Sequence, residues 1–234
     1  MNGTLTWVLD VIAAVAALGT AAVGLVDATK AFNGGLSNAG FSHIRQVVTR
    51  LVGHLDTPTT PGTGAFGWAD TLLTLRANWM NGMAKADQKA AAKGLIRLNL
   101  TPDTAAEMAP VAGVPSPEFK AAVKKLYAGT PLGPDELGVL GRFDAIVSAM
   151  LDEAYERADQ SYRNAAKLTA ALIAVALAIA GGAVVHTGST DYWSSSDLVV
   201  AILVGLVSTP LAPVAKDLAT ALTAATRAAG VLRR

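Results

Sequence analysis

The chain has 234 residues, of which 52% are apolar and only 16% are charged, and its net charge at pH 7 is +1. Ordinary soluble domains are about 25% charged, so this composition argues against a fully soluble protein, and the small net charge does not indicate a polyanionic partner. Cysteine is absent and only three histidines occur, which argues against disulfides, thiolate metal sites and a histidine-rich active site.

The first predicted element is an apolar helix from Trp7 to Val26, in which Asp10 is the only charged residue. About 20 such residues are enough to cross the ~30 Å hydrocarbon core of a bilayer. A cleaved signal peptide needs basic residues before its apolar stretch, and none precedes this one. We therefore expect residues 1–33 to contain a first transmembrane helix that is retained and has its N-terminus outside.

Residues 34–167 are expected to form a helical domain in the cytoplasm. Gly34 and Gly35 begin it and are candidate hinge residues, because glycine readily adopts the left-handed conformation that ends a helix. The spacing of apolar residues predicts helices over 41–54, 68–81, 83–99, 102–109 and 116–128. In the fourth of these helices Pro102 is placed at the first helical position, where proline is favoured.

A long uninterrupted helix is predicted from Pro134 to Val185, because no further proline occurs within this stretch. About 50 residues at 1.5 Å each give a helix of about 75 Å. We expect it to run from the cytoplasmic domain into a second transmembrane helix at 168–186. A break near Asn164, where a polar stretch meets an apolar one, is the alternative.

Three segments complete the predicted topology: a short outer loop at 187–197, a third transmembrane helix at 198–215, and a cytoplasmic amphipathic helix at 216–234. Pro210 and Pro213 are candidate kink residues, because proline removes a backbone hydrogen bond from a helix. The carbonyl groups that they free make Thr209 a candidate ion-facing residue. Simple kinking or termination of the helix is the alternative.

The orientation follows from the basic residues. All 19 Lys and Arg lie either between Lys30 and Lys167 or from Lys216 onward. An excess of Lys and Arg near the ends of the spans favours the cytoplasmic side, so we expect a multi-pass protein of a cell inner (plasma) membrane, with its N-terminus outside and its C-terminus cytoplasmic. The richness in Ala and Gly suggests a bacterial source.

Small residues at four-residue spacing form a ridge on each predicted span. Such ridges let helices approach closely within a bilayer. The candidate helix-packing residues are Ala13, Ala17 and Ala21 in the first span, Ala174, Ala178 and Gly182 in the second, and Gly205 in the third. Three ridges exceed what three helices need to pack with one another, so a homo-oligomer is predicted; an Ala-rich chain that forms ridges by chance is the alternative.

Asp10 is the principal candidate for a functional residue. A carboxylate about one turn inside a span rarely faces lipid. In a symmetric assembly, one Asp10 from each subunit would form an acidic ring like those of cation channels, and Thr4 and Thr6 would extend its mouth. The alternatives are that Asp10 is hydrated at the interface or hydrogen-bonds to a neighbouring helix.

Two charged groups in the predicted cytoplasmic domain have a helical period. Asp152, Glu156 and Asp159 share one helix face, which is either solvated or binds a divalent cation. A second face is basic, with residues every four positions: Lys85, Lys89, Lys93 and Arg97. We interpret it as a solvated helix face and expect no nucleic-acid partner.

Enzyme motifs are missing from the sequence. It contains no Ser-His-Asp arrangement, phosphate-binding loop or HExxH motif, so neither an enzymatic activity nor a cofactor is expected. We predict a homo-oligomeric channel that conducts cations through a pore lined by the first transmembrane helix and gated by the cytoplasmic domain. The alternative is a membrane-anchored scaffold whose helical domain binds a cytoplasmic protein. The expected partners are therefore the lipid bilayer, further copies of the chain, and either an inorganic cation or a cytoplasmic protein.

Overall fold

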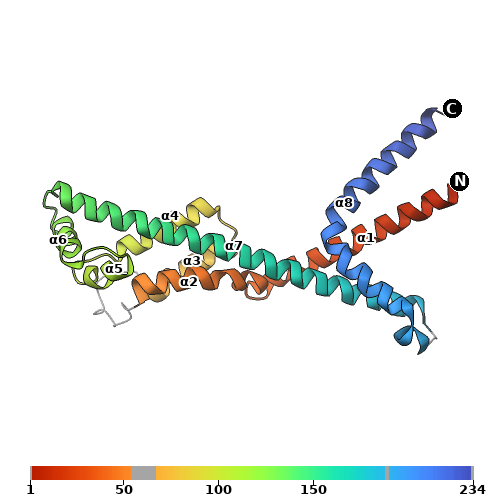
Figure 1. The fold of residues 1–234 in the computed structure, drawn as a ribbon, viewed down its shortest axis with the longest axis horizontal. Helices are drawn as coiled ribbons and strands as arrows, with labels where there is room; N and C mark the ends of the chain where they lie inside the picture. The colour runs from red at the N-terminus through yellow and green to blue at the C-terminus, as the bar shows by residue number, and fades with distance from the viewer. Residues whose placement is uncertain (1, 54–66, 188–189, 233–234) are drawn as a thin grey trace. The chain divides into compact units, whose positions relative to one another are not determined.

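The computed structural model describes residues 2–53, 67–187 and 190–232, and every regular element in these ranges is a helix (Figure 1). The α-helices are α1 (Asn2–Ala28), α2 (Asn38–Val52), α3 (Trp68–Met80), α4 (Lys85–Leu98), α5 (Ala105–Val111), α6 (Ser116–Tyr127), α7 (Pro134–Val185) and α8 (Ser196–Leu232). Short 3-10 helices are η1 (Thr29–Ala31), η2 (Gly35–Ser37) and η4 (Thr190–Ser194).

Three segments are long and apolar enough to cross a membrane, namely Asp10–Ala31, Pro134–Val185 and Ser196–Val214. The predictions of an all-α fold and of three such helices are confirmed. The chain divides into two compact units: one comprises Met1–Leu36 with Arg163–Arg234, and the other comprises Ser37–Tyr162.

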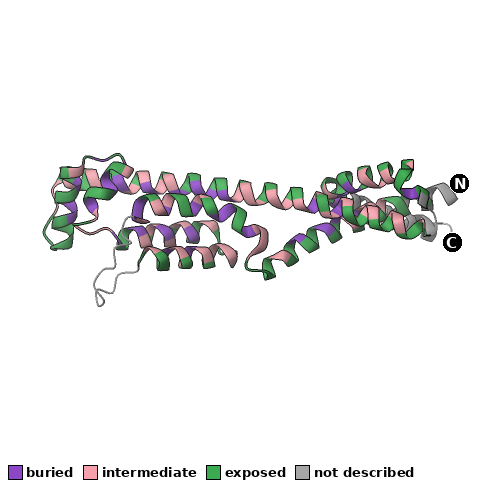
Figure 2. Cartoon of the chain, turned by 90° about the horizontal axis from the view of Figure 1, so that it is seen from below, coloured by how far each residue is buried: buried purple, intermediate pink, exposed green. Residues whose placement is uncertain are grey.

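Helix α2 contributes one apolar face to the core of the 37–162 unit. Ile44, Val48 and Leu51 recur at three- and four-residue steps and are fully buried, as the amphipathic pattern predicts. They pack in one cluster with residues of α7 such as Val147 and Leu151, and Figure 2 shows that the buried residues of both helices follow one side of each. Other members of the cluster are Phe41, Val52, Leu75, Ala92, Ile96, Met108, Phe119, Val123, Phe143 and Tyr155.

Helix α5 begins at Ala105, three residues later than predicted. Thr104 Oγ1 accepts a hydrogen bond from the Thr101 amide at 2.8 Å and donates one to the Asn99 carbonyl at 2.7 Å, and these bonds close a turn before the helix. Pro102 lies in that turn. The placement of Pro102 at the first helical position is therefore wrong, because the threonine side chains favour a turn at this point.

Helix α7 is continuous over 52 residues, from Pro134 to Val185. The predicted uninterrupted helix is confirmed, and no break occurs near Asn164. No glycine or proline lies between Arg142 and Ala180, so the change from polar to apolar residues is accommodated without interrupting the backbone hydrogen bonds.

Close backbone contacts join the apolar helices of the other unit. A Cβ atom on Gly19 of α1 would lie 2.5 Å from the carbonyl oxygen of Ser208 in α8, and one on Gly205 of α8 would lie 2.5 Å from Cα of Val175 in α7. Only glycine permits these approaches. Helix α8 itself changes direction sharply along its length (Figure 1), and Pro210 and Pro213 inside it are the physical cause of such a bend.

Some residues of the small-residue ridges are buried within the chain and others are exposed. Ala174 and Gly205 are buried, whereas Ala13, Ala17 and Ala21 are exposed. The face of α1 that packs within the chain consists instead of Ala16, Gly19, Ala22 and Val26, all of them buried. A packing role for the exposed alanines therefore remains a prediction about contacts between copies.

Candidate functional site

Asp10 lies on the face of α1 that the rest of its unit leaves uncovered. At 100° per residue, Asp10, Ala17 and Gly24 share one side of the helix, opposite the side that carries Gly19. All three are exposed, and no hydrogen bond or ion pair joins Asp10 to another described residue. The side chains of Thr4 and Thr6 lie outside the described residues.

Two hydroxyl groups lie directly before the prolines of α8. Pro210 and Pro213 lie inside the helix, and the Ser208 hydroxyl donates to the Gly205 carbonyl at 2.9 Å. Thr209 Oγ1 is buried and has no hydrogen-bond partner among the described residues. An unpaired buried hydroxyl is unfavourable, so Thr209 is a candidate polar contact for water, an ion or a second chain.

Gly34 and Gly35 form a tight turn after η1. Asn33, Gly34 and Gly35 all have positive φ, at 52°, 85° and 47°. The Gly34 amide donates to the Lys30 carbonyl at 3.1 Å, and the Gly35 amide donates to the Phe32 carbonyl at 3.0 Å. Because a left-handed backbone is required at three successive residues, glycine is favoured at the two positions named as candidate hinges.

An aromatic contact fixes η4 against the end of α7. Tyr192 is buried, and its hydroxyl donates to the Ile179 carbonyl at 3.1 Å, where Gly182 leaves room for the ring. His186 stacks on Tyr192 at 5.2 Å between ring centroids, and its Nε2 lies 3.2 Å from Asp197 Oδ2 at the start of α8. The role of Gly182 in the structure is thus to admit Tyr192, which the spacing of small residues did not indicate.

Ion pairs join α4 to α7 within the 37–162 unit. Lys85 lies 2.8 Å from Glu156 and 3.8 Å from Asp159, and Lys89 lies 2.6 Å from Asp152. The acidic face considered as a divalent-cation site is therefore neutralised by the basic face of α4. Because the basic face of α4 lies against the acidic face of α7, the prediction that the basic face is simply solvated is also incomplete.

Asp144 ends this row of pairs and accepts hydrogen bonds from Lys93, at 2.6 Å, and from Arg97. Partial burial of the carboxylate raises its pKa, while the hydrogen bonds from the two cations lower it. The hydrogen bonds prevail, so the pKa of Asp144 lies below its ordinary value. Asp144 is therefore expected to stay ionised and to hold α4 against α7.

Asp144→Asn is expected to flatten the acid dependence of the stability of this unit. Because the folded carboxyl has the lower pKa, its contribution is complete well above pH 4 and is lost as the pH falls through the folded pKa. At pH 7 the free energy of unfolding of the variant should be about 0.5–1 kcal/mol below that of the wild type, as expected for a partly exposed ion pair. Between pH 5 and pH 2 the free energy of unfolding should fall by less in the variant than in the wild type. Urea unfolding at each pH measures this, with Asp103→Asn on an exposed turn as the control. An unchanged pH slope in Asp144→Asn would contradict the assignment.

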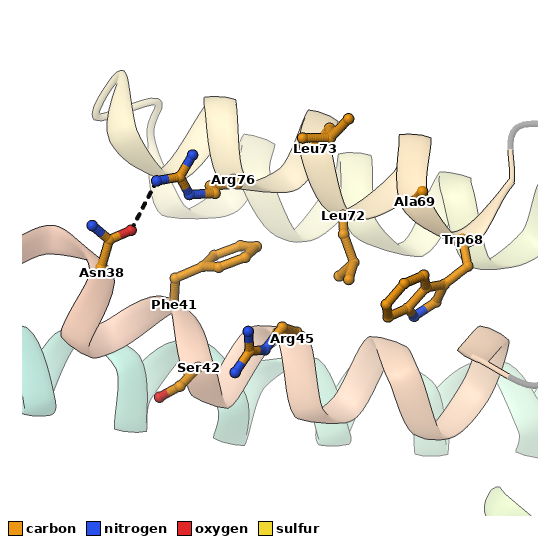
Figure 3. Close-up of a pocket in the computed structure, with 9 residues that line it drawn as sticks. All are labelled: Asn38, Phe41, Ser42, Arg45, Trp68, Ala69, Leu72, Leu73 and Arg76. Carbon is orange, nitrogen blue, oxygen red and sulfur yellow. Dashed lines mark hydrogen bonds between the residues drawn. The ribbon is translucent and has the colours of Figure 1, made fainter. Parts of the chain in front are cut away.

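A groove of about 430 Å³ lies between α2 and α3 (Figure 3). Phe41, Trp68 and Leu72 line it together with two arginines, Arg45 and Arg76. The sequence does not indicate this feature, because its lining residues belong to two helices and helical spacing does not show which helices lie side by side. One feature of the sequence does indicate a binding surface: the outward face of α2 carries arginines and no carboxylate.

Among the described residues, no group of three or more His, Cys, Asp and Glu side chains is placed to hold a metal ion. Comparisons of the chain with models of protein families, with curated proteins and with solved structures found no match.

Proposed function

We propose that the chain is a subunit of a homo-oligomeric channel in a bacterial inner membrane, with a cation-conducting pore lined by α1. The observation that carries the proposal is the exposed carboxylate of Asp10 on a face of α1 whose small residues Ala17 and Gly24 are exposed as well. A carboxylate facing lipid is unfavourable, whereas one facing a water-filled pore is hydrated and attracts cations.

The proposed orientation places the N-terminus outside and the C-terminus in the cytoplasm. Every basic residue lies between Lys30 and Lys167 or from Lys216 onward, and this asymmetry favours retention of those segments in the cytoplasm. The exposed side chains of Trp7 and Trp193 suit the outer interface in this orientation. The continuous helix α7 supports a gating role for the 37–162 unit, since it contains residues of both units.

Purified full-length chain in planar bilayers is expected to pass cation-selective current. Asp10→Asn should lower the ratio of cation to anion permeability by roughly tenfold, because a ring of charge at a pore mouth concentrates counter-ions. Asp191→Asn, which removes an exposed carboxylate of η4 proposed to lie on the same side of the membrane, serves as the control and should change the ratio little. A chain that stays monomeric in lipid, or that conducts nothing under any condition, contradicts the channel.

A membrane-anchored scaffold is the second candidate function, and the groove between α2 and α3 favours it. In a scaffold Asp10 would have no functional role, and the 37–162 unit would need an accessible binding surface. Stoichiometric recovery of one partner with the wild type, together with the absence of any conductance, would select this function over the channel.

A further inference from the structure

The groove between α2 and α3 has a defined length. At one end the Trp68 indole N–H donates to Thr49 Oγ1 at 3.3 Å, and at the other the Arg76 guanidinium donates to Asn38 Oδ1 at 3.1 Å. The residues that line the groove run from Asn38 to Arg45 on α2 and from Trp68 to Arg76 on α3, and the longer of these stretches corresponds to a length of ~12 Å. The groove is therefore about two helical turns long.

The floor of the groove is apolar. Figure 3 shows Phe41 of α2 and Leu72 of α3 pointing into the space between the helices, with the Trp68 ring beside them. Leu73 lies at the outer edge and is 63% exposed, although it is a large apolar side chain on a helix of a folded unit. Apolar side chains of a second molecule would be removed from water by this surface.

The surroundings of the groove are basic. Arg45 and Arg76 are among its nine lining residues, and no carboxylate is. A second hollow on the outward face of α2 continues from it through Ser42 and Arg45 and adds His43 and Arg50. Helix α2 contains no acidic residue, and the single carboxylate of α3, Asp70, does not line either hollow.

We propose that this groove binds an acidic amphipathic helix of a partner protein. The occupant's apolar face would contact Phe41 and Leu72, and its Asp or Glu side chains would pair with Arg45 and Arg76. A short helix fits because the groove lies between two helices and is about two turns long. The apolar floor between two helices is accessible to a narrow, curved segment and less so to the flat surface of a bilayer, which favours a protein over a membrane. The inference rests on the interaction role proposed for the 37–162 unit and does not depend on conduction.

The test uses full-length chain in uncharged nanodiscs and two labelled helical peptides of about three turns. Both peptides carry Leu along one face; one carries Glu on its flanks and the other carries Lys at the same positions. Fluorescence anisotropy is expected to give a Kd on the order of 10 µM for the Glu peptide, and binding of the Lys peptide should be at least roughly tenfold weaker.

Two exposed residues of the groove supply the decisive variants. Arg45→Glu and Leu73→Glu should each raise the Kd of the Glu peptide by about tenfold or more, because each places a negative charge next to the negative charges of the peptide. Lys124→Glu on α6 and Leu98→Glu on α4 are matched controls with exposed side chains outside the groove, and they should change the Kd by less than about twofold. Circular dichroism verifies that all four variants remain folded.

Three outcomes would overturn the proposal. The first is the absence of binding of the Glu peptide at millimolar concentration, and the second is equal binding of the two peptides. The third is that the wild type binds phosphatidylglycerol vesicles but not the Glu peptide, and that Arg45→Glu and Leu73→Glu abolish the vesicle binding. This result would assign the groove to a lipid surface. The cation selectivity of Asp10→Asn and the presence or absence of current test the channel alone and do not affect this result.

Discussion

Substitution of Gly40 by alanine is expected to lower the free energy of unfolding of the 37–162 unit by about 2 kcal/mol. A Cβ atom on Gly40 would overlap the backbone carbonyl oxygen of Ala158 in α7 and would lie 2.7 Å from Cζ2 of Trp79. Neither neighbour moves easily, because the carbonyl belongs to a continuous helix and the Trp79 indole N–H donates to the Ser37 carbonyl at 2.7 Å. Helix α2 must therefore shift away from α7, which loosens the contacts of buried residues such as Ile44.

The matched control is the same substitution at Gly94, in the interior of α4. No atom lies within 4 Å of the Cβ position there, so Gly94→Ala should raise the stability by about 0.5–1 kcal/mol through the better helix propensity of alanine. Hydrogen exchange of the full-length chain, followed by mass spectrometry for the amides of α2 and α4, measures both effects. Changes of the same sign in the two variants would show that close packing at Gly40 does not limit the stability.

The helices of the 37–162 unit could be predicted because their signal is local. In α2, the apolar residues Ile44, Val48 and Leu51 recur at helical spacing, and the side that they occupy is the side that is buried. The first residue of a helix is harder to predict where two local signals compete. At α5 the hydrogen bonds of Thr104 outweigh the preference of Pro102 for the first turn.

The pairing of the charged stripes could not be predicted from their spacing. Steps of four residues place Lys85, Lys89 and Lys93 on one face of a helix, but they do not identify the helix that lies opposite. That information comes from the core contacts, which set α4 against α7 and bring Lys89 to Asp152. The groove was missed for a related reason, since Phe41 and Leu72 have the same sequence pattern as residues that are wholly enclosed.

The packed face of α1 was not identified because small residues occur all around this helix. Ala13, Ala17 and Ala21 satisfy the four-residue rule, and so do neighbouring alanines on other sides. Gly19 determines which face packs, because α8 approaches it so closely that a side chain there would overlap Ser208 and Ala212. Sequence spacing identifies a helix that can pack closely, whereas the partner determines which face it uses.

Gly19→Leu is therefore expected to separate α1 from α8. The Cβ atom alone would lie 2.5 Å from the Ser208 carbonyl oxygen and 2.6 Å from Cβ of Ala212, so the helices must move apart and lose the burial of Ala16 and Ala22. Overpacking of this kind costs about 3 kcal/mol. Titration with sodium dodecyl sulfate in mixed micelles, under conditions where the chain is monomeric, should show unfolding at a lower mole fraction of the denaturing detergent.

Gly24→Leu is the matched control on the same helix and also tests the proposed assembly. Gly24 is exposed and has no atom within 4 Å of its Cβ position, so unfolding of the monomer should not change. Gly24 shares its face of α1 with Asp10 and Ala17, the face proposed to meet other copies around a pore. Native mass spectrometry from lipid nanodiscs should therefore detect fewer oligomers for Gly24→Leu. A wild-type chain that is oligomeric, and stays so in Gly24→Leu, would show that the copies do not converge at this face of α1.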